Sequence, residues 1–135
     1  MSIFSKIRVG EAEGYVVFDS DSVTAILDIC PINPGHLLVF PHEEVDYIFD
    51  LPQDRYHEVL DVVRRLAMPL KKVTSANRIG VTVEGFGVPH VHVHMVPVNA
   101  GNELNPERAS PASKEELSAM AKRIRDSIAE LPATI

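Results

Sequence analysis

Apolar and polar residues alternate most strictly around His90, His92 and His94, which are separated by single valines. Successive side chains of a β-strand point to opposite faces, so this pattern predicts a strand whose apolar residues enter the core while all three imidazoles share the other face. At a rise of ~3.3 Å per residue, next-but-one rings start about 6.6 Å apart, which is close enough to surround one small anion or metal ion. The pattern predicts a shared histidine site.

Other apolar runs are typical of strands. Residues 15–18 and 23–27 are β-branched and aromatic and flank a polar turn, which predicts a hairpin. Residues 36–40 follow a Pro-Gly turn and have the apolar density of a buried strand. Residues 79–83 lead through a tight turn at 84–87 into the histidine strand, so these two strands are predicted to be antiparallel neighbours.

Helical spacing of apolar residues marks the segments between these strands. A long apolar face recurs over residues 56–70 and predicts the main helix, with Pro52 in its first turn and Pro69 ending or kinking it. A short helix is predicted before Gly10, and a single helical turn over residues 45–49.

The last helix is predicted from its capping box. Ser113 is followed three residues later by Glu116, a pattern that opens helices. Its apolar stripe is expected to pack on the body or on a partner subunit; the stripe comprises Leu117, Met120, Ala121, Ile124 and Ile128. The order of elements predicts an α+β fold in which an antiparallel sheet carries the main helix and the C-terminal helix.

Length and charge narrow the function classes. The 135 residues predict a single domain over 1–135, with its core at about 3–98 and a C-terminal loop and helix at about 99–135. A formal net charge of -6 disfavours binding to a nucleic acid polymer. No apolar run approaches the length of a membrane span, and the first six residues lack the apolar block of a secretory signal, so we expect a cytoplasmic protein with no membrane partner.

Six histidines and one cysteine are the main candidates for chemistry. Burying three adjacent imidazoles is costly unless they are paired, so we expect the histidine face to line a polar cleft. Three adjacent histidines are compatible with two kinds of chemistry: neutral imidazoles can hold a metal ion, or one imidazole can form a covalent phosphohistidine. His36 is the best candidate for a fourth member, whereas His42 and His57 are expected to be structural. Cys30 is expected to be a small buried side chain.

The segment from His90 to Pro97 resembles the histidine-triad signature of the HIT superfamily, in which histidines alternate with apolar residues. Residues 3–7 resemble the N-terminal segment of that family. Residues 27–41, which contain Asp28-Ile29-Cys30-Pro31 and Pro34-Gly35-His36, resemble its second conserved block. The resemblance covers roughly residues 3–98 and keeps the expected order of motifs.

This resemblance implies a HIT-like fold, usually a homodimer, that binds purine nucleotides and requires no metal or other cofactor. It assigns His92 as the nucleophile that attacks the α-phosphorus of a nucleoside phosphoramidate or a dinucleoside polyphosphate, forming a nucleotidyl-histidine that water hydrolyses. His94 would contact phosphate oxygens, and His90 and His36 would complete the cluster and tune its protonation. The implied protein is therefore an enzyme, a HIT-type nucleotide hydrolase.

The same resemblance assigns the substrate-binding residues. Asp28 takes the position of a ribose-binding residue, with turn capping as its alternative role, and Ile29 takes that of a wall of the base pocket. Two positions depart from the family pattern: Phe86 replaces a usual glutamine, and Glu84 lies near the usual asparagine in a shortened loop. Because a carboxylate repels phosphate, we hypothesise that Glu84 selects a cationic leaving group such as an amine.

Two alternatives to this enzyme stay open at the level of sequence. The same pocket could serve a nucleotide-binding or scaffold module without turnover, or the histidines could hold the zinc of a metal-dependent hydrolase.

Overall fold

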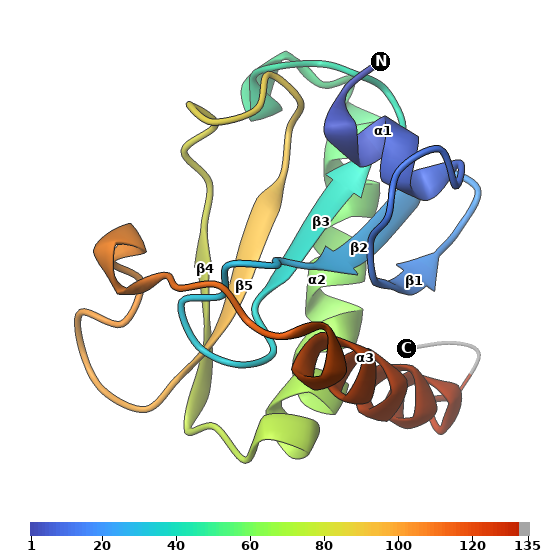
Figure 1. Cartoon of the computed structure of the whole chain (residues 1–135). Helices are drawn as coiled ribbons and strands as arrows, with labels where there is room; N and C mark the ends of the chain where they lie inside the picture. Colours follow the sequence, from blue (N-terminus) through green and yellow to red (C-terminus); the bar gives the residue numbers. More distant parts are fainter. Residues whose placement is uncertain (133–135) are drawn as a thin grey trace.

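The computed structural model describes residues 1–132 and shows a five-stranded sheet with the order β1-β2-β3-β5-β4 (Figure 1). Every neighbouring pair of strands is antiparallel, as predicted. The strands are β1 (Val16–Asp19), β2 (Val23–Leu27), β3 (Leu37–Pro41), β4 (Arg78–Thr82) and β5 (Val93–Val98). The helices are α1 (Ile3–Arg8), α2 (Gln53–Thr74) and α3 (Lys114–Ala129), with 3-10 turns η1 (Ile48–Asp50) and η2 (Pro106–Arg108).

The sheet separates two apolar clusters. The larger cluster lies between the sheet and the helices α2 and α3, and it includes Val39, Val93 and Met95 of the central strands. On the opposite face, Phe4 of α1 joins a smaller cluster with Phe40. Side chains that lie opposite each other in paired strands share a face, and His94 pairs with Leu38, a member of the smaller cluster. The histidine face is therefore the face that α1 partly covers.

The two predicted long helices are confirmed. Ser113 caps α3 by accepting a hydrogen bond from the Glu116 N–H, and the apolar stripe of α3 packs into the larger cluster. None of the helices that the structure describes is long and apolar enough to cross a bilayer. Residues 133–135, the end of the C-terminal segment predicted over 99–135, lie outside the described residues.

Two expectations about local structure are corrected. Of the two effects expected of Pro69, an end of the helix is wrong, because α2 continues to Thr74 and stops at Ser75, which has a left-handed φ of 56°. Leu66 and Leu70 are almost fully buried on either side of the proline, and their packing outweighs the hydrogen bond that proline cannot make. The connection between β4 and β5 is also not a tight turn, because Thr82 pairs with His94 and residues 83–93 lie between them.

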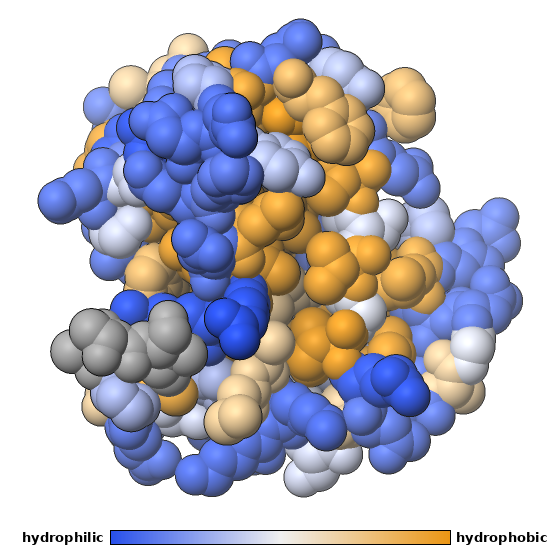
Figure 2. Space-filling model, turned by 180° about the vertical axis from the view of Figure 1, so that it is seen from behind, coloured by the Kyte–Doolittle hydropathy of each residue, from blue (hydrophilic) through white to orange (hydrophobic). Residues whose placement is uncertain are grey.

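The back of the molecule shows where apolar side chains reach the surface. In Figure 2 they gather around the centre and on the side of the edge strand β4, with hydrophilic residues at the periphery. Val81 of β4 is 48% exposed and Met68 of α2 is 73% exposed. The edge strand β4 thus carries an exposed valine, and α2 carries an exposed methionine.

Candidate active site

Three elements bring four histidines together. His94 lies in β5, His90 and His92 lie in the segment that precedes this strand, and His36 immediately precedes β3. Val91, Val93 and Met95 enter the larger apolar cluster, so the histidines alternate onto the opposite face as predicted. The ring centroids of His92 and His94 are 5.0 Å apart, and those of His36 and His94 are 5.1 Å apart. The prediction of a strand holds only from residue 93 onward.

His90 is a fully buried ring with a partner at each nitrogen. Its Nε2 lies 2.7 Å from the Pro41 carbonyl oxygen, which can only accept, so this nitrogen carries the proton. Nδ1 then accepts from the Ser2 hydroxyl at 2.6 Å. Burial is the main cause that lowers the pKa of His90, and the ring is therefore neutral near pH 7. His90 is held too firmly to line an open cleft, which corrects that expectation for one of the three rings.

His92 is oriented by the main chain of His90. Its Nδ1 lies 2.7 Å from the His90 carbonyl oxygen, so Nδ1 must donate, and neutral His92 keeps an unprotonated Nε2. The ring is 6% exposed and packs edge-on against Phe4, with ring centroids 4.9 Å apart. The unprotonated Nε2 is the nitrogen with nucleophilic capacity.

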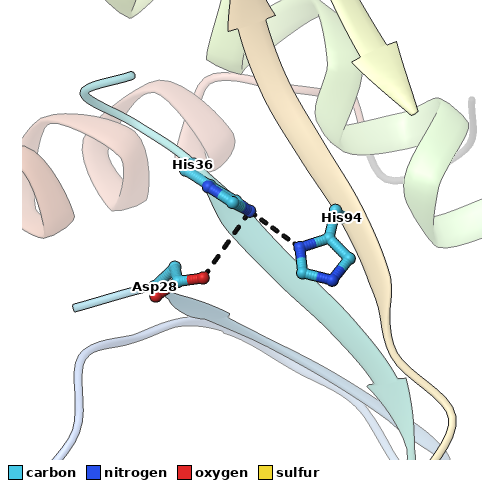
Figure 3. A group of neighbouring side chains, drawn as sticks. All are labelled: Asp28, His36 and His94. Atoms are coloured by element: carbon cyan, nitrogen blue, oxygen red, sulfur yellow. Dashed lines mark hydrogen bonds and ion pairs between the residues drawn. The ribbon is translucent and has the colours of Figure 1, made fainter. Parts of the chain in front are cut away.

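His36 and His94 form a directed chain of hydrogen bonds (Figure 3). The Ile32 N–H donates to Nδ1 of His36 at 3.0 Å, so neutral His36 carries its proton on Nε2. Nε2 lies 2.9 Å from Nδ1 of His94, to which it donates, and neutral His94 therefore carries its own proton on Nε2. His94 thus presents an N–H donor, the complement of the acceptor that His92 presents.

Burial keeps this chain neutral. It lowers the pKa of His36 to about 4, although the Asp28 carboxylate 3.7 Å away opposes the shift. Burial and then the neighbouring His92 lower the pKa of His94, against the opposing carboxylates of Asp28 and Glu84. Near neutral pH both rings keep the tautomers that their hydrogen bonds require.

Asp28, His36 and His94 have the chemistry of a metal site, since one ligand atom from each lies within 4.8 Å of the others. A metal needs an unprotonated ring nitrogen. His36 faces this group with Nε2, which is protonated as long as Nδ1 accepts from Ile32. Metal binding here would therefore require breaking the Ile32 bond, so the residues fit a hydrogen-bond chain better than a metal centre.

Two cavities adjoin His92. The histidine cavity has a volume of about 210 Å³, and its lining includes Ile32, Thr82, Glu84, His92, His94 and Leu104. The aromatic cavity has a volume of about 240 Å³, and its lining includes Asp46, Tyr47, Phe49, Tyr56, Glu84 and His92. His92 and Glu84 thus lie where the two cavities meet.

The remaining predicted residues have different positions. Asp28 both caps a turn, accepting from the Cys30 N–H at 2.9 Å, and faces His36. Ile29 is 57% exposed. Glu84 lines both cavities, and Phe86, although 94% exposed, also lines the histidine cavity. Cys30 is exposed and not buried, which corrects that expectation, because the turn capped by Asp28 directs its side chain to solvent.

The other two histidines lie apart from this cluster. His57 is an exposed residue of α2, and His42 lies 3.0 Å from the Thr24 hydroxyl at the far end of β3. Sequence reasoning missed the groups that orient the cluster, namely the Ser2 hydroxyl, the Ile32 N–H and the Pro41 carbonyl. Two of these are main-chain groups, which leave no signal in residue type.

The model of the HIT domain family matches residues 9–101 of this chain. The chain belongs to the HIT family. The superfamily predicted from the histidine motif is thereby confirmed, and so is the α+β fold, since the chain superposes on a crystal structure of a HIT-like protein from Bartonella henselae. That similarity has a TM-score of 0.82 at 30% identity and covers 93% of this chain and 95% of the other.

HIT relatives are found in distant organisms. A HIT-like protein of Saccharolobus solfataricus is 34% identical over 102 residues, which are 72% of this chain and 73% of that protein. The asymmetrical bis(5'-nucleosyl)-tetraphosphatase of Schizosaccharomyces pombe is 33% identical over 99 residues, which are 70% of this chain and 53% of that enzyme. Some relatives in the family are thus named as enzymes that act on nucleotides.

Proposed function

We propose that this HIT protein is a purine nucleotide hydrolase or transferase that cleaves at the α-phosphate of a nucleoside phosphoramidate or a dinucleoside polyphosphate through His92. One observation carries the proposal: the His92 Nδ1–H bond to the His90 carbonyl makes Nε2 the unprotonated nitrogen of the neutral ring, at the junction of the two cavities. A neutral imidazole with a free Nε2 is a nucleophile near neutral pH without further activation.

The proposed reaction has two steps. Nε2 of His92 forms a bond to the α-phosphorus, and the bond to the leaving group breaks with its electron pair, so that the leaving group departs with a proton from solvent. Water then attacks the phosphorus of the nucleotidyl-histidine, the P–N bond breaks and returns its electron pair to Nε2, and the nucleotide is released while the water loses a proton to solvent. The N–H of His94 beside His92 donates to a phosphate oxygen as negative charge develops there.

The supporting residues are proposed from the histidine hydrogen bonds and, for Asp28 and Ile29, from the resemblance to the family. His36 orients His94 through the 2.9 Å bond between their rings, and His90 orients His92 through its carbonyl. Asp28 binds ribose hydroxyls with its part-exposed carboxylate, and Ile29 forms a wall for the purine base. The protonated Nε2 of His36 supports a reaction that requires no metal. The exposed Val81 on the edge strand β4 supports a homodimer.

The test compares hydrolysis of an adenosine phosphoramidate and of diadenosine polyphosphates by the wild-type protein and by His92→Ala. We expect turnover of at least one substrate and a loss of about 10³-fold or more in the variant, because the covalent path is removed. A quenched reaction of the wild type should also show a protein mass increased by one nucleotidyl group.

A second candidate function is a nucleotide-binding module without turnover, which the replacement of a polar residue by Phe86 favours. In that case the wild type binds purine nucleotides, none of these substrates is hydrolysed, and no nucleotidyl adduct forms. Retained hydrolysis in His92→Ala would contradict the covalent mechanism itself.

A further inference from the structure

The two cavities beside His92 are acidic. Glu84 lines both of them and Asp46 lines the aromatic cavity. Among the residues that the structure describes, neither cavity is lined by a lysine or an arginine. A leaving group that departs from phosphorus at His92 therefore meets carboxylates and no permanent cation.

The loop that carries Glu84 lies close to the segment that carries Asp46. Gly85 has a φ of +90°, and a side chain added to it would approach the Asp46 carbonyl oxygen at 3.9 Å. Next to Asp46, the rings of Tyr47 and Phe49 meet edge to face with centroids 5.3 Å apart. Carboxylates beside aromatic faces are a combination that attracts organic ammonium groups.

We infer that Glu84, together with Asp46, makes the aromatic cavity a subsite for a cationic amine leaving group. The inference rests on the proposed function and narrows its substrate to phosphoramidates whose leaving amine carries a second, positively charged ammonium. A polyphosphate leaving group has several negative charges, and the carboxylates repel it. Glu84 acts here as a specificity-determining residue and takes no part in bond breaking.

The test uses three adenosine phosphoramidates whose leaving amines have chains of equal length. The far end of the chain carries an ammonium, a hydroxyl or a carboxylate group. Their affinities are measured by calorimetry in a His92→Asn background, in which no covalent step can occur, and kcat/KM is measured with His92 intact. The variants are Glu84→Gln and Asp46→Asn. Glu11→Gln serves as the matched control, since Glu11 is an exposed carboxylate beyond α1, on the side of β1, the opposite edge strand of the sheet.

The informative quantity is the affinity ratio of the ammonium substrate to the hydroxyl substrate. Because Glu84 is exposed and screened, we expect Glu84→Gln to lower this ratio roughly threefold to fivefold, and Asp46→Asn to lower it in the same direction, while Glu11→Gln leaves it unchanged. The carboxylate substrate should gain affinity in Glu84→Gln.

Equal affinity of the wild type for all three substrates, or a ratio unchanged in both Glu84→Gln and Asp46→Asn, would overturn the inference. Because the ratio is measured on binding, it separates this outcome from failure of the proposed function. If the affinity ratio shifts as expected but His92-containing protein hydrolyses none of the substrates, the subsite is supported and the hydrolase is contradicted.

Discussion

Acidification should destabilise this protein through His36. The substitution His36→Gln tests this, because it removes the titrating ring and keeps both an acceptor and a donor. The wild-type ring accepts from the Ile32 N–H and donates to His94. A glutamine amide offers the same two functions without a pKa in this range. The two proteins therefore differ in whether this position binds a proton.

The magnitude follows from the burial of the ring. His36 is 2% exposed, and its pKa falls from 6.5 to about 4, chiefly because burial disfavours the charged form. Between these values the unfolded chain binds a proton at His36 that the folded chain does not, so stability falls as the pH falls. At about 1.36 kcal/mol per pH unit, lowering the pH from about 6.5 to about 5 costs the wild type about 2 kcal/mol.

The assay is urea unfolding at about pH 7.5 and about pH 5, with the free energy of unfolding compared between wild type and variant. We expect the deficit of His36→Gln relative to wild type to shrink by about 2 kcal/mol at the lower pH. Val39→Ala, a non-ionisable change in β3 on the face away from the histidines, should keep a constant deficit. A constant deficit in His36→Gln as well would refute the assignment of a buried, neutral His36.

Three further predictions concern the groups around the cluster. Ser2→Ala should lower the free energy of unfolding by about 1–2 kcal/mol in urea titrations, because it removes both the cap of α1 and the partner of the buried His90 ring; an unchanged midpoint would contradict this. Gly35→Ala should cost about 1 kcal/mol or more and reduce the hydrolysis rate, since Gly35 has a φ of +93° and a new Cβ would lie 2.8 Å from Thr74 Cγ2, beside His36. Chelator-treated protein should keep its hydrolytic activity, and stoichiometric zinc found by elemental analysis, with activity lost on its removal, would argue for the metal-dependent alternative.

Much of the fold could be predicted because periodicity reports which face of an element is buried. The alternation around His92 predicted the two faces of β5, and the capping box at Ser113 predicted the start of α3. Pro69 was misleading because a local steric preference competes with tertiary packing, which residue type alone does not reveal. The length of the loop after Thr82 depends on strand register, which is also a tertiary property.

The site was predictable in its members and not in its chemistry. The four histidines could be named from spacing and resemblance, but their tautomers depend on the Ile32 N–H and on the carbonyls of Pro41 and His90. Every residue except proline carries the same N–H and every residue the same carbonyl, so no sequence pattern marks the ones that orient a ring. The assignment of His92 as the acceptor and His94 as the donor therefore depends on the folded structure and has no counterpart in the sequence.

Strand β5 pairs with a neighbour on each side, whereas the connection that leads to it from β4 does not. The connection and the strand should therefore differ in how well they tolerate insertions and deletions. Residues 83–89 form a connection, so adding or deleting a residue there moves Glu84 and the cavity lining but leaves the register of β5 unchanged. An insertion between His92 and His94 would instead turn one of these rings toward Val39 and Val93 in the larger cluster, because side chains alternate with a period of two. Natural variation in length should therefore accumulate before His90 and be absent from there to the end of β5.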